Sequence, residues 1–138
     1  MTRLIIAAVI VAVTVLVALV VRRRHPDAPT QAAGAVPAQL DRSDFARPDA
    51  AWLVAVFTSA TCHTCADVVA KAQVLASDEV AVVEVEYGGR GATHRRYRID
   101  AVPTLVLADA DGVVRASTLG PVSASDLWAL VAQARDTP

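Results

Sequence analysis

Cysteine is scarce in this sequence of 138 residues, which contains only Cys62 and Cys65. A zinc site normally takes four protein ligands, or three together with a water molecule. Beyond the two cysteines, only His63 and His94 are plausible further ligands, and nothing in the pattern fixes them nearby. We therefore expect no metal, and half of a zinc site stands as an alternative interpretation of the two cysteines.

The sequence also lacks a basic surplus and an internal repeat. It has 13 Lys and Arg residues against 14 Asp and Glu residues, a formal charge of −1. All 14 acidic residues follow residue 24, against 9 of the 13 basic ones, so residues 25–138 carry a formal −5. Proteins that bind nucleic acids show a basic footprint. We therefore expect no nucleic acid among the partners.

What the sequence does have is a long apolar run from Leu4 to Val21, without a charged residue. A helix of that length spans about 27 Å, close to the hydrocarbon thickness of a bilayer. The alternative is a cleaved signal peptide, whose apolar core is usually about 7–15 residues. Arg22, Arg23 and Arg24 follow the run at once. We expect residues 1–24 to form an uncleaved single-pass anchor in a lipid bilayer.

The charges that flank this run predict its orientation. Arg3 and the terminal amine precede it, whereas three arginines follow it. The side richer in Lys and Arg usually faces the cytoplasm. We therefore expect a cytoplasmic globular part, by a margin of one or two charges, with an extracytoplasmic domain as the alternative.

The rest of the chain divides into a linker and one small domain. Residues 25–39 contain three prolines and no apolar periodicity, which predicts a flexible linker. Residues 40–138 are long enough for one core. The expected elements are helices over 41–46, 63–77, 92–98 and 126–135, strands over 51–59, 80–86, 104–108 and 113–117, and a break over 87–91. This order predicts a three-layer α/β sandwich with a mixed sheet.

The two cysteines lie where the first strand turns into a helix, in the motif Cys62-His63-Thr64-Cys65. A helix N-terminus favours an anion and lowers the pKa of a thiol, and a thiolate is the form that attacks disulfides. With two residues between them, the cysteines can close a small disulfide ring. The residues themselves favour thiol–disulfide exchange, and two inert buried thiols are a further alternative.

Three segments together resemble the thioredoxin family. They are Phe57 to Cys65, Tyr97 to Thr104 with Val102-Pro103-Thr104 about 38 residues after the motif, and Asp111-Gly112 with Gly120 before the closing helix. The resemblance covers about residues 36–134, and the whole chain is similar to small membrane-anchored thioredoxin-like proteins. It implies a thioredoxin-like α/β/α sandwich and a location in the plasma membrane of a bacterium.

The resemblance also implies roles for individual residues. Cys62 would attack, as the more exposed and more acidic cysteine, and Cys65 would resolve the mixed disulfide. Pro103 would be cis, which leaves the backbone of Val102 free to pair with an extended substrate. His63 and Thr64 would tune the redox potential. The alternative interpretation of His63 is an exposed residue at the helix start without a special role. No cofactor is implied beyond the Cys62–Cys65 disulfide itself.

The chain departs from the family pattern beside the cysteines. Thr61 replaces the usual tryptophan, Val56 stands where a buried aspartate often acts as a proton relay, and its lysine partner corresponds to Val82. These departures favour a narrower or slower exchange role. The basic residues before Pro103, namely Arg90, His94, Arg95, Arg96 and Arg98, form either a solvated helix face or a surface for acidic partners.

Two hypotheses from different classes follow. The first is a membrane-tethered oxidoreductase that exchanges disulfides with protein thiols and an unidentified electron donor or acceptor. The second is a non-catalytic thioredoxin-fold module that binds a partner or senses redox state. The intact Cys62 and Cys65 pair favours the first hypothesis, whereas the missing aspartate and tryptophan leave room for the second.

Overall fold

The structure is a computed structural model that describes Met1, residues 11–17 and residues 36–136. The chain divides into two units, residues 1–30 and residues 31–138. In the first unit, residues 11–17 are helical and their side chains are exposed. No helix among the described residues is long and apolar enough to cross a bilayer. Most of the predicted span from Leu4 to Val21, and most of the predicted linker, lie outside the described residues.

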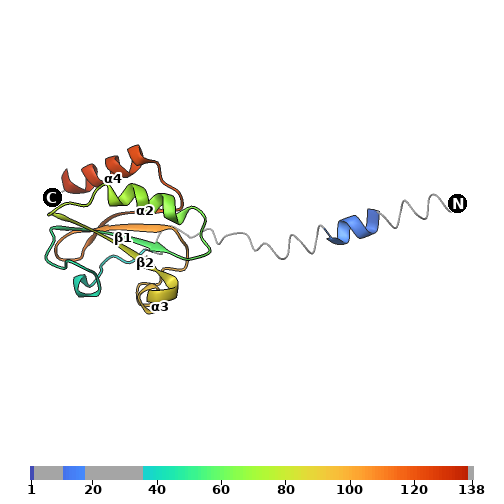
Figure 1. Cartoon of the computed structure of the whole chain (residues 1–138), viewed down its shortest axis with the longest axis horizontal. Helices are drawn as coiled ribbons and strands as arrows, with labels where there is room; N and C mark the ends of the chain where they lie inside the picture. Colours follow the sequence, from blue (N-terminus) through green and yellow to red (C-terminus); the bar gives the residue numbers. More distant parts are fainter. Residues whose placement is uncertain (2–10, 18–35, 137–138) are drawn as a thin grey trace. The chain divides into compact units, whose positions relative to one another are not determined.

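The second unit is a mixed α/β fold built on a four-stranded sheet with the order β2-β1-β3-β4 (Figure 1). The strands are β1 (Trp52–Thr58), β2 (Val80–Glu86), β3 (Thr104–Ala108) and β4 (Val114–Leu119). Strands β1 and β2 are parallel, whereas β3 is antiparallel to both β1 and β4. The predicted mixed sheet is therefore confirmed, with strand bounds close to those expected.

Helices cover both faces of the sheet. On one face lie α2 (Cys65–Gln73) and α4 (Ala124–Asp136), and on the other lie α3 (Tyr87–Arg96) and the 3₁₀ turn η1 (Arg42–Asp44) (Figure 1). The apolar side chains form one core cluster on each side of the sheet. Strand β1 supplies both clusters, since its alternate residues point to opposite faces and its interior residues are fully buried.

The helices begin and end differently from the prediction. Helix α2 starts at Cys65 rather than at residue 63, and the expected helix over 41–46 is a single 3₁₀ turn. The expected break over 87–91 is shorter than predicted, because α3 already begins at Tyr87 and only Arg90, with φ −131° and ψ 33°, has a non-helical backbone. Glu86 explains this start, since its carboxylate accepts the backbone N–H of Gly89 at 3.0 Å and caps the helix.

Candidate functional site

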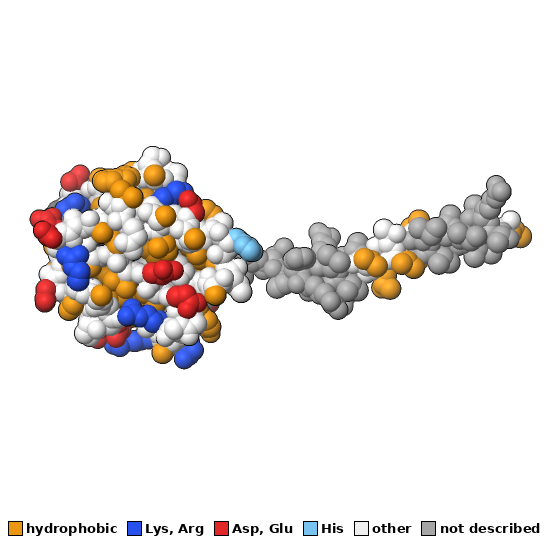
Figure 2. All heavy atoms as spheres, viewed as in Figure 1, with side chains coloured by type: hydrophobic (Ala, Val, Ile, Leu, Met, Phe, Trp, Pro, Cys, Tyr) orange, Lys and Arg blue, Asp and Glu red, His pale blue; other side chains and the backbone are white. Residues whose placement is uncertain are grey.

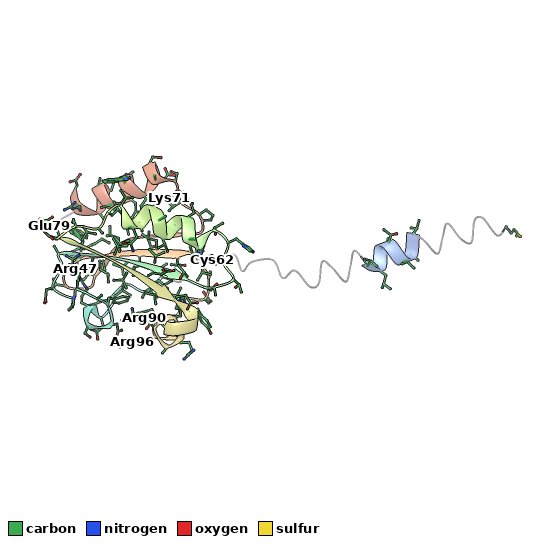
Figure 3. The ribbon with its side chains drawn as sticks, in the orientation of Figure 1. Arg47, Cys62, Lys71, Glu79, Arg90 and Arg96 are labelled. Carbon is green, nitrogen blue, oxygen red and sulfur yellow. A yellow bond between two sulfur atoms is a disulfide. The ribbon has the colours of Figure 1, made fainter. Side chains whose placement is uncertain are left out.

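The sheet brings two loops to the same end of the domain. Strands β1 and β3 are antiparallel, and Phe57 pairs with Thr104. The residues that follow β1 and those that precede β3 therefore lie at one end of the sheet. The first loop carries Cys62 and the second carries Val102 and Pro103. Figure 3 shows Cys62 at this end, where the chain enters α2.

Cys62 and Cys65 form a disulfide with an S–S distance of 2.03 Å and a Cα–Cα distance of 5.4 Å. Cys65 is the first residue of α2 and is 3% exposed, because the first turn of the helix packs against the sheet. Cys62 lies three residues earlier and is partly exposed. The two cysteines thus differ in access to a large substrate, and the more exposed one is Cys62.

The N-terminus of α2 has no side-chain cap. Thr64 occupies the N-cap position, and its side chain makes no capping hydrogen bond. Its hydroxyl lies 3.8 Å from the Cys62 sulfur instead. His63 and Thr64 are both exposed on the loop between the two sulfurs. The first N–H groups of the helix are therefore left to interact with a charge that develops on sulfur.

The second loop is held at both sides of Pro103. The Val102–Pro103 peptide bond is cis, as predicted. The Pro103 carbonyl accepts the N–H of Gly120 at 2.8 Å, and the Thr104 hydroxyl donates to the Ala101 carbonyl at 2.7 Å. Within residues 36–136, no hydrogen bond occupies the backbone of Val102. That backbone is free to meet another chain.

The side chains below the motif correct one expectation. Val56 is fully buried, and its partner across the parallel pair is Glu84 rather than Val82. Glu84 accepts a hydrogen bond from the Thr58 hydroxyl at 2.9 Å, and Thr58 is 1% exposed. A carboxylate therefore lies beside the end of β1. The sequence alone could not place it, because the register of β1 against β2 is a tertiary property.

Glu86 is a functional candidate that sequence reasoning missed. Backbone N–H groups lower the pKa of Glu86, first that of Gly88, then that of Gly89, and also that of Ala60 in the loop before Cys62. A carboxylate that ends a strand and is followed by two glycines was the available signal. This charge lies close both to the start of α3 and to the loop that carries Cys62.

The predicted basic face divides into separate environments. His94 is 1% exposed, so it does not belong to a solvated face. Its Nε2 lies 2.7 Å from the Val85 carbonyl, and its ring packs edge-on against Phe57 and Tyr87. Arg96 forms ion pairs with Asp41, the N-cap of η1, at 3.1 Å and with Asp44 of η1 at 2.9 Å. The structure thus keeps only the arginines of this group at the surface.

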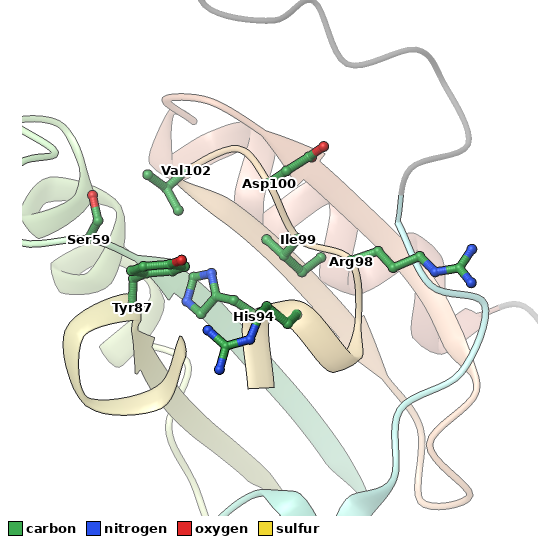
Figure 4. Close-up of a pocket in the computed structure, with 8 residues that line it drawn as sticks. Ser59, Tyr87, His94, Arg98, Ile99, Asp100 and Val102 are labelled. Atoms are coloured by element: carbon green, nitrogen blue, oxygen red, sulfur yellow. The ribbon is translucent and has the colours of Figure 1, made fainter. Parts of the chain in front are cut away.

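His94 also lines a groove of about 550 Å³ beside the second loop. Figure 4 shows Tyr87 and His94 on one side of the groove and Ile99 and Val102 on the other. Ser59, from the loop that leads to Cys62, lies at its end. The groove therefore connects the two loops that form the site.

The alternative of a zinc site finds no support in this arrangement. The two cysteines are joined to each other. His94, one of the two candidate histidines, is buried against Val85 on the opposite face of the sheet from α2. Among the residues that the structure describes, no group of three or more His, Cys, Asp or Glu side chains could hold a metal ion.

Comparison with known proteins bears on the fold alone. No protein-family model matches the chain, and no curated protein matches it in sequence. A solved structure described as "Structure of a malarial protein" is similar, with a TM-score of 0.55 and 20% sequence identity. The match covers 60% of this chain and 96% of that chain. Together with the spacing of Cys62 and Cys65, this mixed α/β architecture is compatible with a thioredoxin-like fold.

Proposed function

We propose that this chain is a thioredoxin-like thiol–disulfide oxidoreductase that exchanges disulfides with other proteins. The observation that carries the proposal is the Cys62–Cys65 disulfide, which has one partly exposed and one buried cysteine at an uncapped helix start. An inert structural disulfide has no need of such an asymmetry. Exchange requires this asymmetry, because one sulfur must be accessible to the substrate while the other stays buried until it resolves the mixed disulfide.

The reaction follows from this arrangement. The Cys62 thiolate attacks a substrate disulfide, so that a mixed disulfide forms and the first substrate sulfur leaves as a thiolate and takes up a proton. Cys65 then loses its proton and attacks the Cys62 sulfur. The Cys62–Cys65 disulfide forms and the second substrate sulfur leaves. Two electrons and two protons pass to the substrate, and the reverse sequence oxidises it.

The proton of Cys65 needs an acceptor. Val56 is apolar, so the position beneath the motif supplies no acid or base. In this proposal the proton leaves to water, to the substrate thiolate released in the first step or to Glu84, whose carboxylate is already hydrogen-bonded to Thr58. Proton transfer without a dedicated base beneath the motif fits a slower or more specialised exchange than general protein reduction.

The second part of the proposal is a membrane location. The apolar run from Leu4 to Val21 is long enough to anchor the chain, and Arg22 to Arg24 favour a cytoplasmic domain. The bacterial plasma membrane is the proposed site. Reporter fusions at the C-terminus test the orientation, since activity of an extracytoplasmic reporter would contradict it.

A non-catalytic module that holds a partner or senses redox state is the second candidate. The absence of an acid at Val56 favours it, because a binding module needs no route for the Cys65 proton. Its oxidised and reduced forms would differ in affinity for the partner, and neither would turn over.

Insulin reduction by dithiothreitol separates the two candidates. We expect the full chain, solubilised in a mild nonionic detergent, to accelerate the reaction over the Cys62→Ser variant. The Cys65→Ser variant should accumulate a mixed disulfide with insulin, which mass spectrometry detects. Equal rates for the wild type and Cys62→Ser, without a trapped species, would refute the oxidoreductase.

A further inference from the structure

The groove beside the Val102 loop has an apolar interior. Tyr87 from α3 faces Ile99 and Val102 from the loop before Pro103 (Figure 4). Tyr87 is half exposed, whereas Ile99 is buried and Val102 is partly buried. The groove therefore offers an apolar floor to a side chain that arrives from outside. The unpaired backbone of Val102 lies at its edge, and Ser59 connects it to the Cys62 loop.

One side of the groove is basic. Arg95 lines it and lies beside Tyr87, since a Cβ added at Gly91 would meet Arg95 Nη1 at 3.3 Å and Tyr87 Cζ at 3.8 Å. Helix α3 contains no Asp or Glu. Figure 3 labels Arg90 and Arg96 on this helix, and Figure 2 shows basic side chains on the same lower side of the domain.

The arginines of α3 do not share the same role. Arg96 is held by the carboxylates of Asp41 and Asp44. Within residues 36–136, neither Arg90 nor Arg95 takes part in an ion pair. A basic group that lines an apolar groove and forms no ion pair within residues 36–136 attracts an acidic group from a partner.

The opposite side has a different charge. Asp100 lines the groove on the side of Ile99 and Val102. Arg98 also belongs to the lining residues, but its side chain points away from His94 (Figure 4). An occupant would therefore place its acidic group towards Arg95 and its apolar group between Tyr87 and Val102. These requirements describe an extended peptide more closely than an isolated anion.

We propose that this groove selects the substrate of the exchange reaction, namely an extended protein segment that carries an apolar residue and an acidic residue beside its reactive cysteine. The apolar side chain lies against Tyr87, Ile99 and Val102, and the carboxylate pairs with Arg95. This inference rests on the proposed exchange function and adds the class of substrate.

Peptides with an activated disulfide test the proposal. Each peptide carries one cysteine as a 2-pyridyl disulfide, one leucine beside it, and flanking residues that are either glutamate, serine or lysine. The Cys62 thiolate of the reduced chain attacks the cysteine sulfur, and pyridine-2-thione leaves and is measured by its absorbance. Cys65 then releases the peptide thiol. Rates with reduced dithiothreitol correct for the intrinsic reactivity of each peptide.

We expect the full chain in detergent to react about tenfold faster with the glutamate peptide than with the lysine peptide at low salt. Arg95→Glu should reduce this preference to less than about twofold or reverse it, because it inverts the charge that faces the peptide. Replacing the leucine of the glutamate peptide by glycine should slow the reaction about fivefold, since the apolar contact is lost.

Arg135→Glu is the matched control. Arg135 lies on α4, on the other face of the sheet, in an exposed ion pair with Glu79. The substitution changes the net charge of the chain as Arg95→Glu does, so a general electrostatic effect would appear in both variants. We expect Arg135→Glu to keep the preference for the glutamate peptide.

The outcomes separate this inference from the proposed function. If the reduced wild type reacts with no peptide faster than Cys62→Ser does, the exchange function itself fails. If it reacts with all peptides equally after correction, exchange stands and the substrate class is wrong. An equal loss of preference in Arg95→Glu and Arg135→Glu would also overturn the groove as the selecting surface.

Discussion

Helices α2 and α3 begin at the same end of the sheet, but only one of them has a side-chain cap at its N-terminus. Each follows one of the two parallel strands, and the last residues of those strands, Thr58 and Glu86, pair with each other. The start of α3 is capped by the Glu86 carboxylate. The start of α2 has no side-chain cap, and it carries a cysteine sulfur instead.

This difference teaches how one end of a fold can serve both structure and chemistry. At a capped N-terminus the free N–H groups are hydrogen-bonded to a fixed side chain, and these bonds stabilise the folded state. An uncapped N-terminus keeps those groups for a charge that forms only when the disulfide is reduced. We therefore expect a change of charge at the start of α2 to alter the reactivity of the sulfur, and a change of charge at the start of α3 to alter the stability of the fold.

Removal of the sulfur at α2 should give the largest effect. Cys62→Ser deletes the group that we propose attacks the substrate, so we expect exchange with the activated peptides to fall to the background rate. Cys65→Ser should instead retain the first step and stop at the mixed disulfide, because only the resolving sulfur is lost. Stopped-flow absorbance and mass spectrometry check both results. A Cys62→Ser variant that still releases pyridine-2-thione through Cys65 would reverse the assigned roles.

A cap of the α3 type can be transferred to α2. Thr64→Asp places a carboxylate at the N-cap, where it competes with the Cys62 thiolate for the same N–H groups and repels its charge. We expect the rate of attack at pH 7 to fall about threefold. Thr64→Asn caps without a charge and should have a smaller effect. If both variants react as fast as the wild type, the uncapped helix start has no role in reactivity.

The far ends of the two helices also differ. Helix α3 ends at Arg96, and Arg98, the residue after the C-cap Tyr97, has a positive φ of 55°. The N–H of Ile99 bonds to the His94 carbonyl at 2.9 Å. Glycine normally occupies such a position. We expect Arg98→Gly to raise the free energy of unfolding by about 0.5–1 kcal/mol in urea denaturation. Arg95→Gly, at a helical position, should lower it by a similar amount; a loss of stability in both variants would contradict the assignment.

The smallest expected effect is the pH dependence of the α3 cap. Backbone N–H groups lower the pKa of Glu86 from its usual 4.5. Its contribution to stability is therefore fully present above about pH 4.5 and is lost as the pH falls through the lowered pKa. Unfolding of wild type and Glu86→Gln at several pH values measures it. The stability difference between them should shrink on acidification, and a constant difference would mean that the charge does not contribute.

The sequence predicted the strands better than the helix ends. Strands β2 and β3 have the predicted bounds, because the partial alternation of apolar and acidic residues in β2 and the apolar run of β3 both identify strands. Helix α3 was missed at Tyr87, because two glycines follow it and the cap from Glu86 forms only in three dimensions. Local composition indicates a break there, but the cap allows a first helical turn to form and the break is reduced to the kink at Arg90.

In the candidate site, too, residue type and spacing predicted some features, whereas others depend on the three-dimensional fold. The motif from Cys62 to Cys65 and the proline at 103 were identified directly, because their chemistry depends on residue type and spacing. Glu84 contacts the end of β1 and Glu86 contacts the loop that follows it, and both positions depend on the register between two strands 28 residues apart in sequence. His94 was assigned to the surface, yet it is buried by aromatic packing that the pattern of α3 did not reveal.

The equilibrium of the full, detergent-solubilised chain with glutathione tests the central claim most directly. Mass spectrometry after alkylation measures the fractions of the Cys62–Cys65 dithiol and disulfide at each ratio of reduced to oxidised glutathione. We predict reversible interconversion with a reduction potential between about −270 and −120 mV, the range of proteins that exchange disulfides. A pair that never forms a disulfide, or one with a potential below about −300 mV as in structural disulfides, would contradict the account.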